Sequence, residues 1–153
     1  MTDSVEVTLG MLVSVSDSLN KASDSLSEQI LEVESALQRY KLGVEVWVNV
    51  HFWDVDAGGG LSPMTRALRL GYGKSNGKWG LLVSESDDDE PAGEGSVCFL
   101  RDATRNTRLA AVEKLPELLT ELVQKATHVA NDATAKANIA RQIAAGLVQM
   151  SPK

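Results

Sequence analysis

The sequence lacks several features that would each identify a broad class of protein. Cys98 is the only cysteine, which excludes an internal disulfide and the usual multi-cysteine zinc sites. The 15 Lys and Arg are outnumbered by 21 Asp and Glu. The resulting formal net charge of −6 argues against a dominant surface for nucleic-acid phosphates, so a nucleic-acid partner is disfavoured.

Long apolar runs are missing as well. No stretch reaches the ~20 consecutive apolar residues that a membrane-spanning helix needs, so we predict no membrane partner. A secretory signal requires a basic start before its apolar segment, whereas Asp3 and Glu6 precede the short apolar run at 9–15. We therefore expect a cytoplasmic protein.

Aromatic residues make up only 5% of the chain, and they are unevenly placed. The three Trp, two Tyr and two Phe all lie between residues 40 and 99. The chain thus has an aliphatic start, an aromatic and glycine-rich middle, and an end rich in Ala and Leu. A length of 153 residues suits a single domain, 1–153, with a core of its own.

The aliphatic start is predicted to form one long helix over 1–42, ending near Gly43. Its apolar residues recur at spacings of three and four, which is close to the seam of a coiled coil. This seam consists of Leu12, Val15, Leu19, Ala22, Leu26, Ile30, Val33, Leu37 and Tyr40. The many serines between residues 14 and 27 lower helix propensity, so packing must supply most of the helix stability.

The middle, 44–100, is predicted to be a small antiparallel sheet with flexible loops at 54–65 and 85–95. Asn76-Gly77 is typical of a two-residue type I′ hairpin turn and fixes the register, so that Tyr72 faces Leu81. One face of this hairpin is then apolar and the other carries glycines.

Strict alternation along the first strand places its indoles on the glycine-bearing face. Two interpretations follow. The indoles cover the glycines as local packing, or they form an exposed platform with basic residues at its margin. In the second case the candidate partner-binding residues are Trp47, His51, Trp53, Arg69 and Lys78.

The last third, 102–150, is predicted to be helical, with Asp102 as its N-cap and Pro116 opening or kinking a second helix. Alanine occupies many of its seam positions, which allows a partner helix to approach closely. Charge is also split: residues 1–90 hold 15 acidic and 7 basic residues, and residues 91–153 hold 6 acidic and 8 basic ones. This split favours pairing between the two ends or between two chains.

We therefore predict an α+β fold of order α-β-β-β-(β)-α-α, with the long N-terminal and C-terminal helices pairing antiparallel over a β-meander. A small sheet only ~20 Å wide cannot cover helices of ~40 Å. The overhanging seams must meet something else, and self-association is the economical answer. We expect a homo-oligomer, with a dimer favoured.

The sequence contains no complete catalytic or phosphate-binding motif. The Gly-Lys-Ser at residues 73–75 lacks the upstream glycine of a phosphate loop, since position 68 is Leu. Asp54 and Asp56 resemble a metal-binding pair, but a turn-forming Asp pair is commoner and the sequence shows no second cluster of ligands. We predict no enzyme, no catalytic residue, no metal and no cofactor.

Three functional hypotheses remain open. The leading one is a non-enzymatic protein–protein interaction and assembly module with an unidentified protein partner. The second is a single-stranded nucleic-acid-binding protein that uses the Trp/Gly face. The third is a small metal-dependent phosphate-handling enzyme around Asp54 and Asp56, with His51 nearby.

Overall fold

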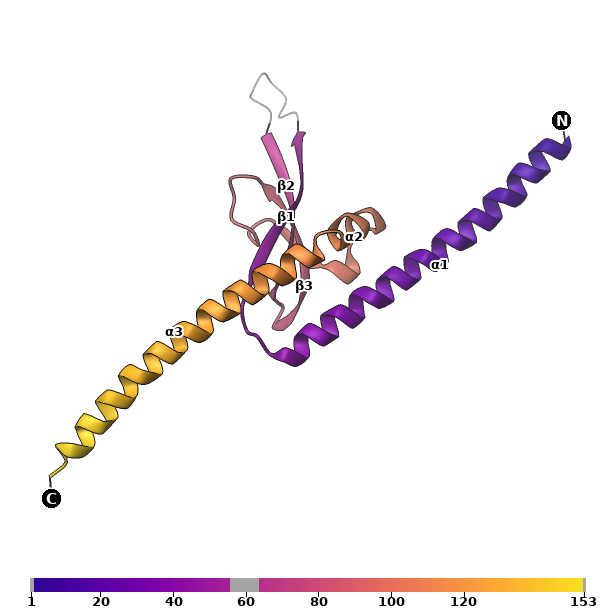
Figure 1. The fold of residues 1–153 in the computed structure, drawn as a ribbon. Helices are drawn as coiled ribbons and strands as arrows, with labels where there is room; N and C mark the ends of the chain where they lie inside the picture. Colours follow the sequence, from indigo (N-terminus) through magenta and orange to yellow (C-terminus); the bar gives the residue numbers. More distant parts are fainter. Residues whose placement is uncertain (1, 56–63, 153) are drawn as a thin grey trace.

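The computed structural model describes residues 2–55 and 64–152, and shows a small antiparallel sheet from which two long helices project (Figure 1). The elements follow in the order α1 (Thr2–Tyr40), β1 (Val46–Val55), β2 (Met64–Ser75), β3 (Lys78–Asp87), β4 (Ser96–Phe99), a short 3₁₀ turn η1 (Leu100–Asp102), α2 (Arg105–Val112) and α3 (Leu115–Gln149). This order confirms the predicted α+β fold with long terminal helices, and it includes the fourth strand.

The sheet is a meander in which the strands lie in sequence order, β1-β2-β3-β4. The β2–β3 hairpin has the predicted register, with Tyr72 opposite Leu81 and Ser75 opposite Lys78. Asn76 and Gly77 both adopt positive φ, 52° and 79°, as a type I′ turn requires. The hairpin was predictable because its turn chemistry is local.

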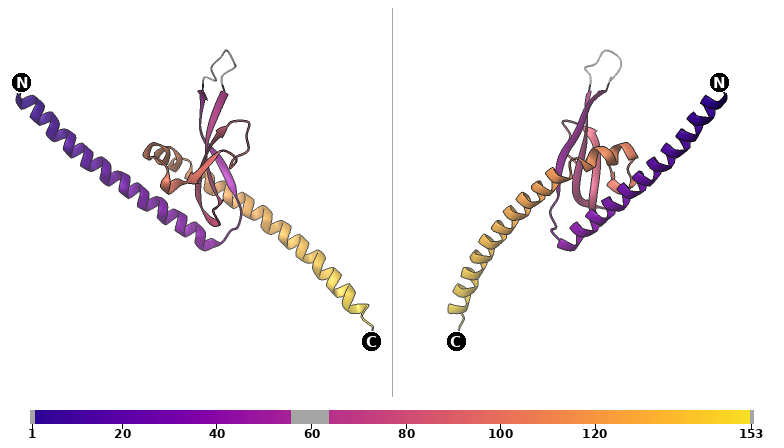
Figure 2. Two further views of the ribbon diagram at one scale, coloured as in Figure 1. Left: turned by 180° about the vertical axis from the view of Figure 1, so that it is seen from behind. Right: turned by 45° about the vertical axis from the view of Figure 1, so that its right-hand side comes forward.

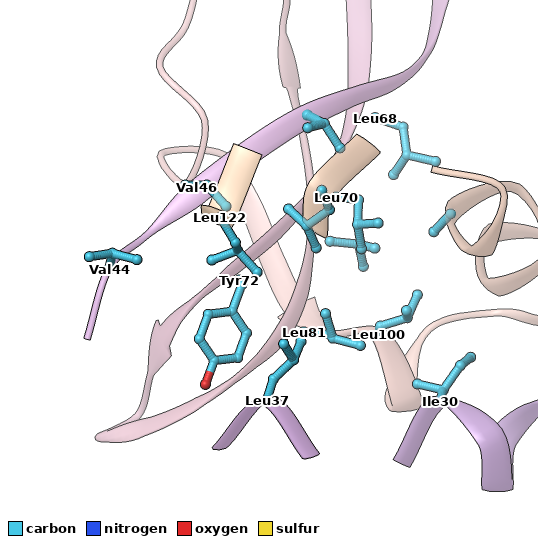
Figure 3. Packing of buried hydrophobic residues seen from close by; sticks show 14 residues of the cluster. Ile30, Leu37, Val44, Val46, Leu68, Leu70, Tyr72, Leu81, Leu100 and Leu122 are labelled. Atoms are coloured by element: carbon cyan, nitrogen blue, oxygen red, sulfur yellow. The ribbon is translucent and has the colours of Figure 1, made fainter. Parts of the chain in front are cut away.

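The core lies where the helices cross one face of this sheet (Figure 3). Ile30 and Leu37 from α1 and Leu122 from α3 meet the apolar side chains of β2 and β3, including the buried Tyr72. The full cluster of buried residues is Ile30, Leu37, Val44, Val46, Val48, Leu68, Leu70, Tyr72, Leu81, Val83, Leu100, Ala111, Leu118 and Leu122. The aliphatic face predicted for the hairpin is therefore the floor of the core.

The antiparallel pairing expected between the two long helices is wrong for the single chain. Over its described length α1 packs against β3 and η1, whereas α3 packs against β1 and β2. The helices then leave the sheet at opposite ends and diverge, as all three views show (Figures 1 and 2). Each helix buries its apolar stripe on different strands, so neither stripe needs the other within this chain.

Several element boundaries also differ from expectation. The first helix ends at Tyr40, where Lys41 turns to a φ of 49°. Asp102 lies in η1 and caps nothing; the N-cap of α2 is Thr104, whose side-chain oxygen accepts from the Thr107 backbone N–H at 3.3 Å. Strands occupy both ends of the predicted 54–65 loop, and its centre, 56–63, lies outside the described residues. The first residues of the predicted 85–95 loop belong to β3.

Candidate interaction surfaces

A β-bulge in β1 separates the residues that were predicted to share one face. Asn49 pairs with Arg69 but His51 pairs with Leu68, so Val50 is an extra residue in the ladder. One inserted residue moves every later side chain of a strand to the opposite face. Trp47 therefore stays on the glycine-bearing face, while His51 and Trp53 turn toward the helix-covered face. The prediction of a single Trp/Gly platform is wrong.

Trp47 serves as packing for the sheet. Its indole lies so close over Gly71 that a Cβ built there would stand 2.5 Å from the ring atoms Cδ2 and Cε3. The indole N–H donates to Glu45 Oε1 at 3.1 Å. On the edge facing the acidic loop, the ring approaches Gly93. The sequence-based packing interpretation is thus confirmed for Trp47 and Gly71, although Trp53 takes no part in it.

Arg69 fastens the acidic loop to the same face. Its guanidinium donates to the backbone oxygens of Asp88 and Glu90, both at 3.0 Å, and to Ser86 Oγ at 3.0 Å. Its Nε donates to Asn49 Oδ1 at 3.3 Å. The loop expected to be flexible is therefore anchored by several hydrogen bonds. Arg69 is committed to internal contacts, which makes it a poor candidate for holding a partner.

The remaining predicted residues lie in two separate grooves. His51 and Trp53 stack with ring centroids 5.4 Å apart, and they line a groove of about 480 Å³ between the β1 bulge and α2. Lys78 borders another groove, of about 410 Å³, beside Trp79 and the end of α1. The structure thus stacks His51 on Trp53 and places Trp47 and Arg69 on one face of the sheet. It does not bring the five predicted partner-binding residues together.

The residues of the metal hypothesis are also dispersed. Asp54 accepts a hydrogen bond from Thr65 Oγ1 at 2.9 Å, on the face of β1 opposite to His51. Asp56 lies outside the described residues. Within 2–55 and 64–152, no group of three or more His, Cys, Asp or Glu side chains is arranged to hold a metal ion.

Glu34 is a buried carboxylate that the sequence did not single out. It lies on α1 among the seam residues, and its side chain is 3% exposed. Oε1 pairs with the Arg101 guanidinium at 2.7 Å, and Oε2 accepts from the Leu81 backbone N–H at 3.3 Å. The β3–β4 ladder ends at Leu82, opposite Phe99, so Leu81 has no partner residue on β4. The Glu34 carboxylate supplies the acceptor that a neighbouring strand would otherwise provide. Burial raises the pKa of Glu34, and Arg101 partly opposes the shift.

These contacts define where each long helix is held. On α1, the side chains nearest the N-terminus that hydrogen-bond to another element are Ser23 and Ser27. Both accept hydrogen bonds from Arg108 of α2. On α3 the corresponding residue is Lys125, whose Nζ donates to the Glu45 backbone oxygen at 2.7 Å. Beyond these points we name residues 2–22 the α1 arm and residues 127–149 the α3 arm.

Every residue of both arms is exposed, yet both arms carry large apolar side chains. In the α1 arm these are Val5, Val7, Leu9, Met11, Leu12, Val13, Val15 and Leu19, and in the α3 arm Val129, Ile139, Ile143, Leu147 and Val148. The stripe that is buried at Ile30 (1% exposed) continues along α1 to Leu12 (63% exposed). The arms continue the core-facing stripes. Among residues 2–55 and 64–152 they are left exposed except at the base of the α1 arm, where Leu19 and Ala22 line a groove with Leu109 of α2.

Two findings limit how the arms can be interpreted. Among the described residues, no helix combines the length and hydrophobicity needed to cross a membrane. No family model, curated protein or solved structure matches the chain. The function must therefore be argued from the residues of the arms themselves.

Proposed function

We propose that this protein is a non-enzymatic assembly module that associates with copies of itself through the α1 arm and the α3 arm. The observation that supports this is the continuity of the apolar stripes. The same helix face that packs on the sheet at Ile30 and Leu37 runs on through Leu19 and Leu12 into solvent. An apolar helix stripe is stable when it is buried, so a stripe that continues into solvent indicates a second surface that packs against it.

Helix stability leads to the same proposal. Isolated helices are marginal in water unless packing supports them, and serine is a weaker helix former than alanine. The α1 arm carries Ser14, Ser16 and Ser18 in one stretch. A 21-residue helix of this composition is expected to be only marginally stable when nothing packs against it. Contact with another apolar helix would supply the missing stabilisation.

The apolar surface of the stripes is comparable to what association costs. Half-burying a Leu, Val or Ile side chain contributes about 1 kcal/mol. The stripes of each chain carry six large apolar arm residues, which are Val5, Leu12, Val15, Leu19, Val129 and Leu147. Two chains would gain about 12 kcal/mol from these side chains, which is of the same order as an association cost of about 4–15 kcal/mol.

The polar residues opposite the α1 stripe support a soluble assembly rather than unlimited aggregation. Opposite the α1 stripe lie Asp3, Ser14, Asp17 and Lys21, as a period of 3.6 residues places them. An apolar stripe with a polar back is typical of helices in a bundle. A separate protein partner and a cytoplasmic location remain predictions from the sequence.

Sedimentation at micromolar concentration tests the proposal. We expect a species of twice the 16.4 kDa chain mass or a higher multiple of it. A monomer at every concentration would contradict self-association. The test needs no knowledge of a partner, because the protein itself is the ligand.

A further inference from the structure

We propose that the assembly is a reciprocal dimer, in which the α1 arm of each chain packs antiparallel along the α3 arm of the other chain. This inference rests on the proposed self-association and specifies which surfaces meet. The two arms leave the sheet at opposite ends, so a chain cannot pair its own arms (Figure 2). A second copy with its ends reversed presents an α3 arm beside each α1 arm.

The sizes of the side chains favour α1 with α3 over either arm with its own copy. The α1 stripe carries large residues, such as Leu12, Val15 and Leu19, whereas the α3 stripe is dominated by alanine. Its small members are Ala133, Ala137, Ala140 and Ala144. Large side chains fill the space above small ones at the density of a protein interior. Two α3 arms together would bury little surface, and two α1 arms would hold their axes apart.

The charges favour contact between an α1 arm and an α3 arm. The α1 arm carries three acidic residues and one basic residue, and the α3 arm carries one acidic and two basic ones. The α1 arm is therefore net acidic and the α3 arm net basic. Opposite net charges favour contact between unlike arms, and like charges disfavour contact between two α1 arms or two α3 arms.

Closure gives a third reason. A reciprocal dimer covers both arms of both chains with a single partner, and the assembly stops there. A head-to-tail arrangement pairs each α1 arm with the next chain's α3 arm in parallel and leaves one arm uncovered at each end. Such a chain grows into open filaments. The closed form satisfies every stripe at the lowest copy number.

Disulfide trapping between two differently labelled copies tests the arrangement. Both copies carry Cys98→Ser, which removes the only native thiol. One copy receives Val5→Cys or Leu19→Cys in the α1 arm, and the other receives Val129→Cys or Ile143→Cys in the α3 arm. We expect cross-links between positions 19 and 129 and between positions 5 and 143. Cross-links between 19 and 143 and between 5 and 129 would overturn the reciprocal dimer in favour of a head-to-tail chain.

Two further outcomes separate this inference from the proposed function. Cross-links confined to two α1 arms or to two α3 arms, in a protein that sediments as a dimer, would overturn only the pairing of α1 with α3. A wild-type protein that sediments as a monomer would overturn self-association itself.

Discussion

The sheet with its crossing helix segments and the two arms share one amphipathic pattern but differ in what covers it. Around the sheet, Ile30, Leu70 and Leu118 are at most 1% exposed. In the arms, residues of the same stripes, such as Leu12 and Leu147, are more than 60% exposed. The difference supports the proposal that a second copy completes the packing, because in the described part of the chain the outer portion of each stripe lies exposed.

The largest expected effect comes from placing charges on the uncovered stripe. Leu12→Glu combined with Leu19→Glu should weaken self-association by at least about a hundredfold, because both carboxylates would be buried between helices. The matched control is Ser14→Glu on the polar face, which should leave association nearly unchanged. Equal sedimentation of the two variants would show that the stripe is not an interface.

A second prediction concerns packing at the sheet. Gly71→Ala should lower the free energy of unfolding by about 1–3 kcal/mol, because its Cβ would meet the Trp47 indole at 2.5 Å. Gly10→Ala in the α1 arm is the opposite case, since its Cβ would meet nothing within 4 Å. Alanine should stabilise that helix by about 0.5–1 kcal/mol. Chemical unfolding of both variants checks the contrast, and similar signs would contradict it.

The third prediction concerns pH and Glu34. Burial holds the pKa of this carboxyl above its ordinary value of 4.5. Between pH 4.5 and the pKa in the folded chain, the folded chain therefore keeps a proton that the unfolded chain has lost. Stability from this group is therefore present below pH 4.5 and is lost as pH rises through the folded pKa. Glu34→Gln should lack this loss. Unfolding measured across pH should show wild type weakening relative to the variant, and parallel curves would contradict the assignment.

The smallest expected effect distinguishes two caps of α2. Thr104→Ala should lower the free energy of unfolding by about 1 kcal/mol, because the Thr107 N–H loses its side-chain acceptor. Asp102→Ala should have little effect, since Asp102 lies in η1 ahead of the cap. Thermal or chemical unfolding measures both losses. A larger loss for Asp102→Ala than for Thr104→Ala would show that Asp102 is the N-cap, as the sequence predicted.

Much of the fold followed from local patterns. The Asn76-Gly77 turn determined the β2–β3 register, and the three-and-four spacing identified α1 and α3. The bulge at Val50 was hidden because the valines of 44–50 alternate as an unbroken strand does. That one residue decided where His51 and Trp53 lie. Glu34 was hidden for another reason: its partners Leu81 and Arg101 are distant in sequence, and only packing brings them together.

Backbone amide hydrogen exchange, followed residue by residue at high and low protein concentration, tests the central claim most directly. The account predicts that residues 2–22 and 127–149 are protected at high concentration and lose protection on dilution, while the strands stay protected throughout. Arms that exchange rapidly at every concentration would contradict the claim that a second copy covers them. So would arms whose protection is independent of concentration down to the monomer.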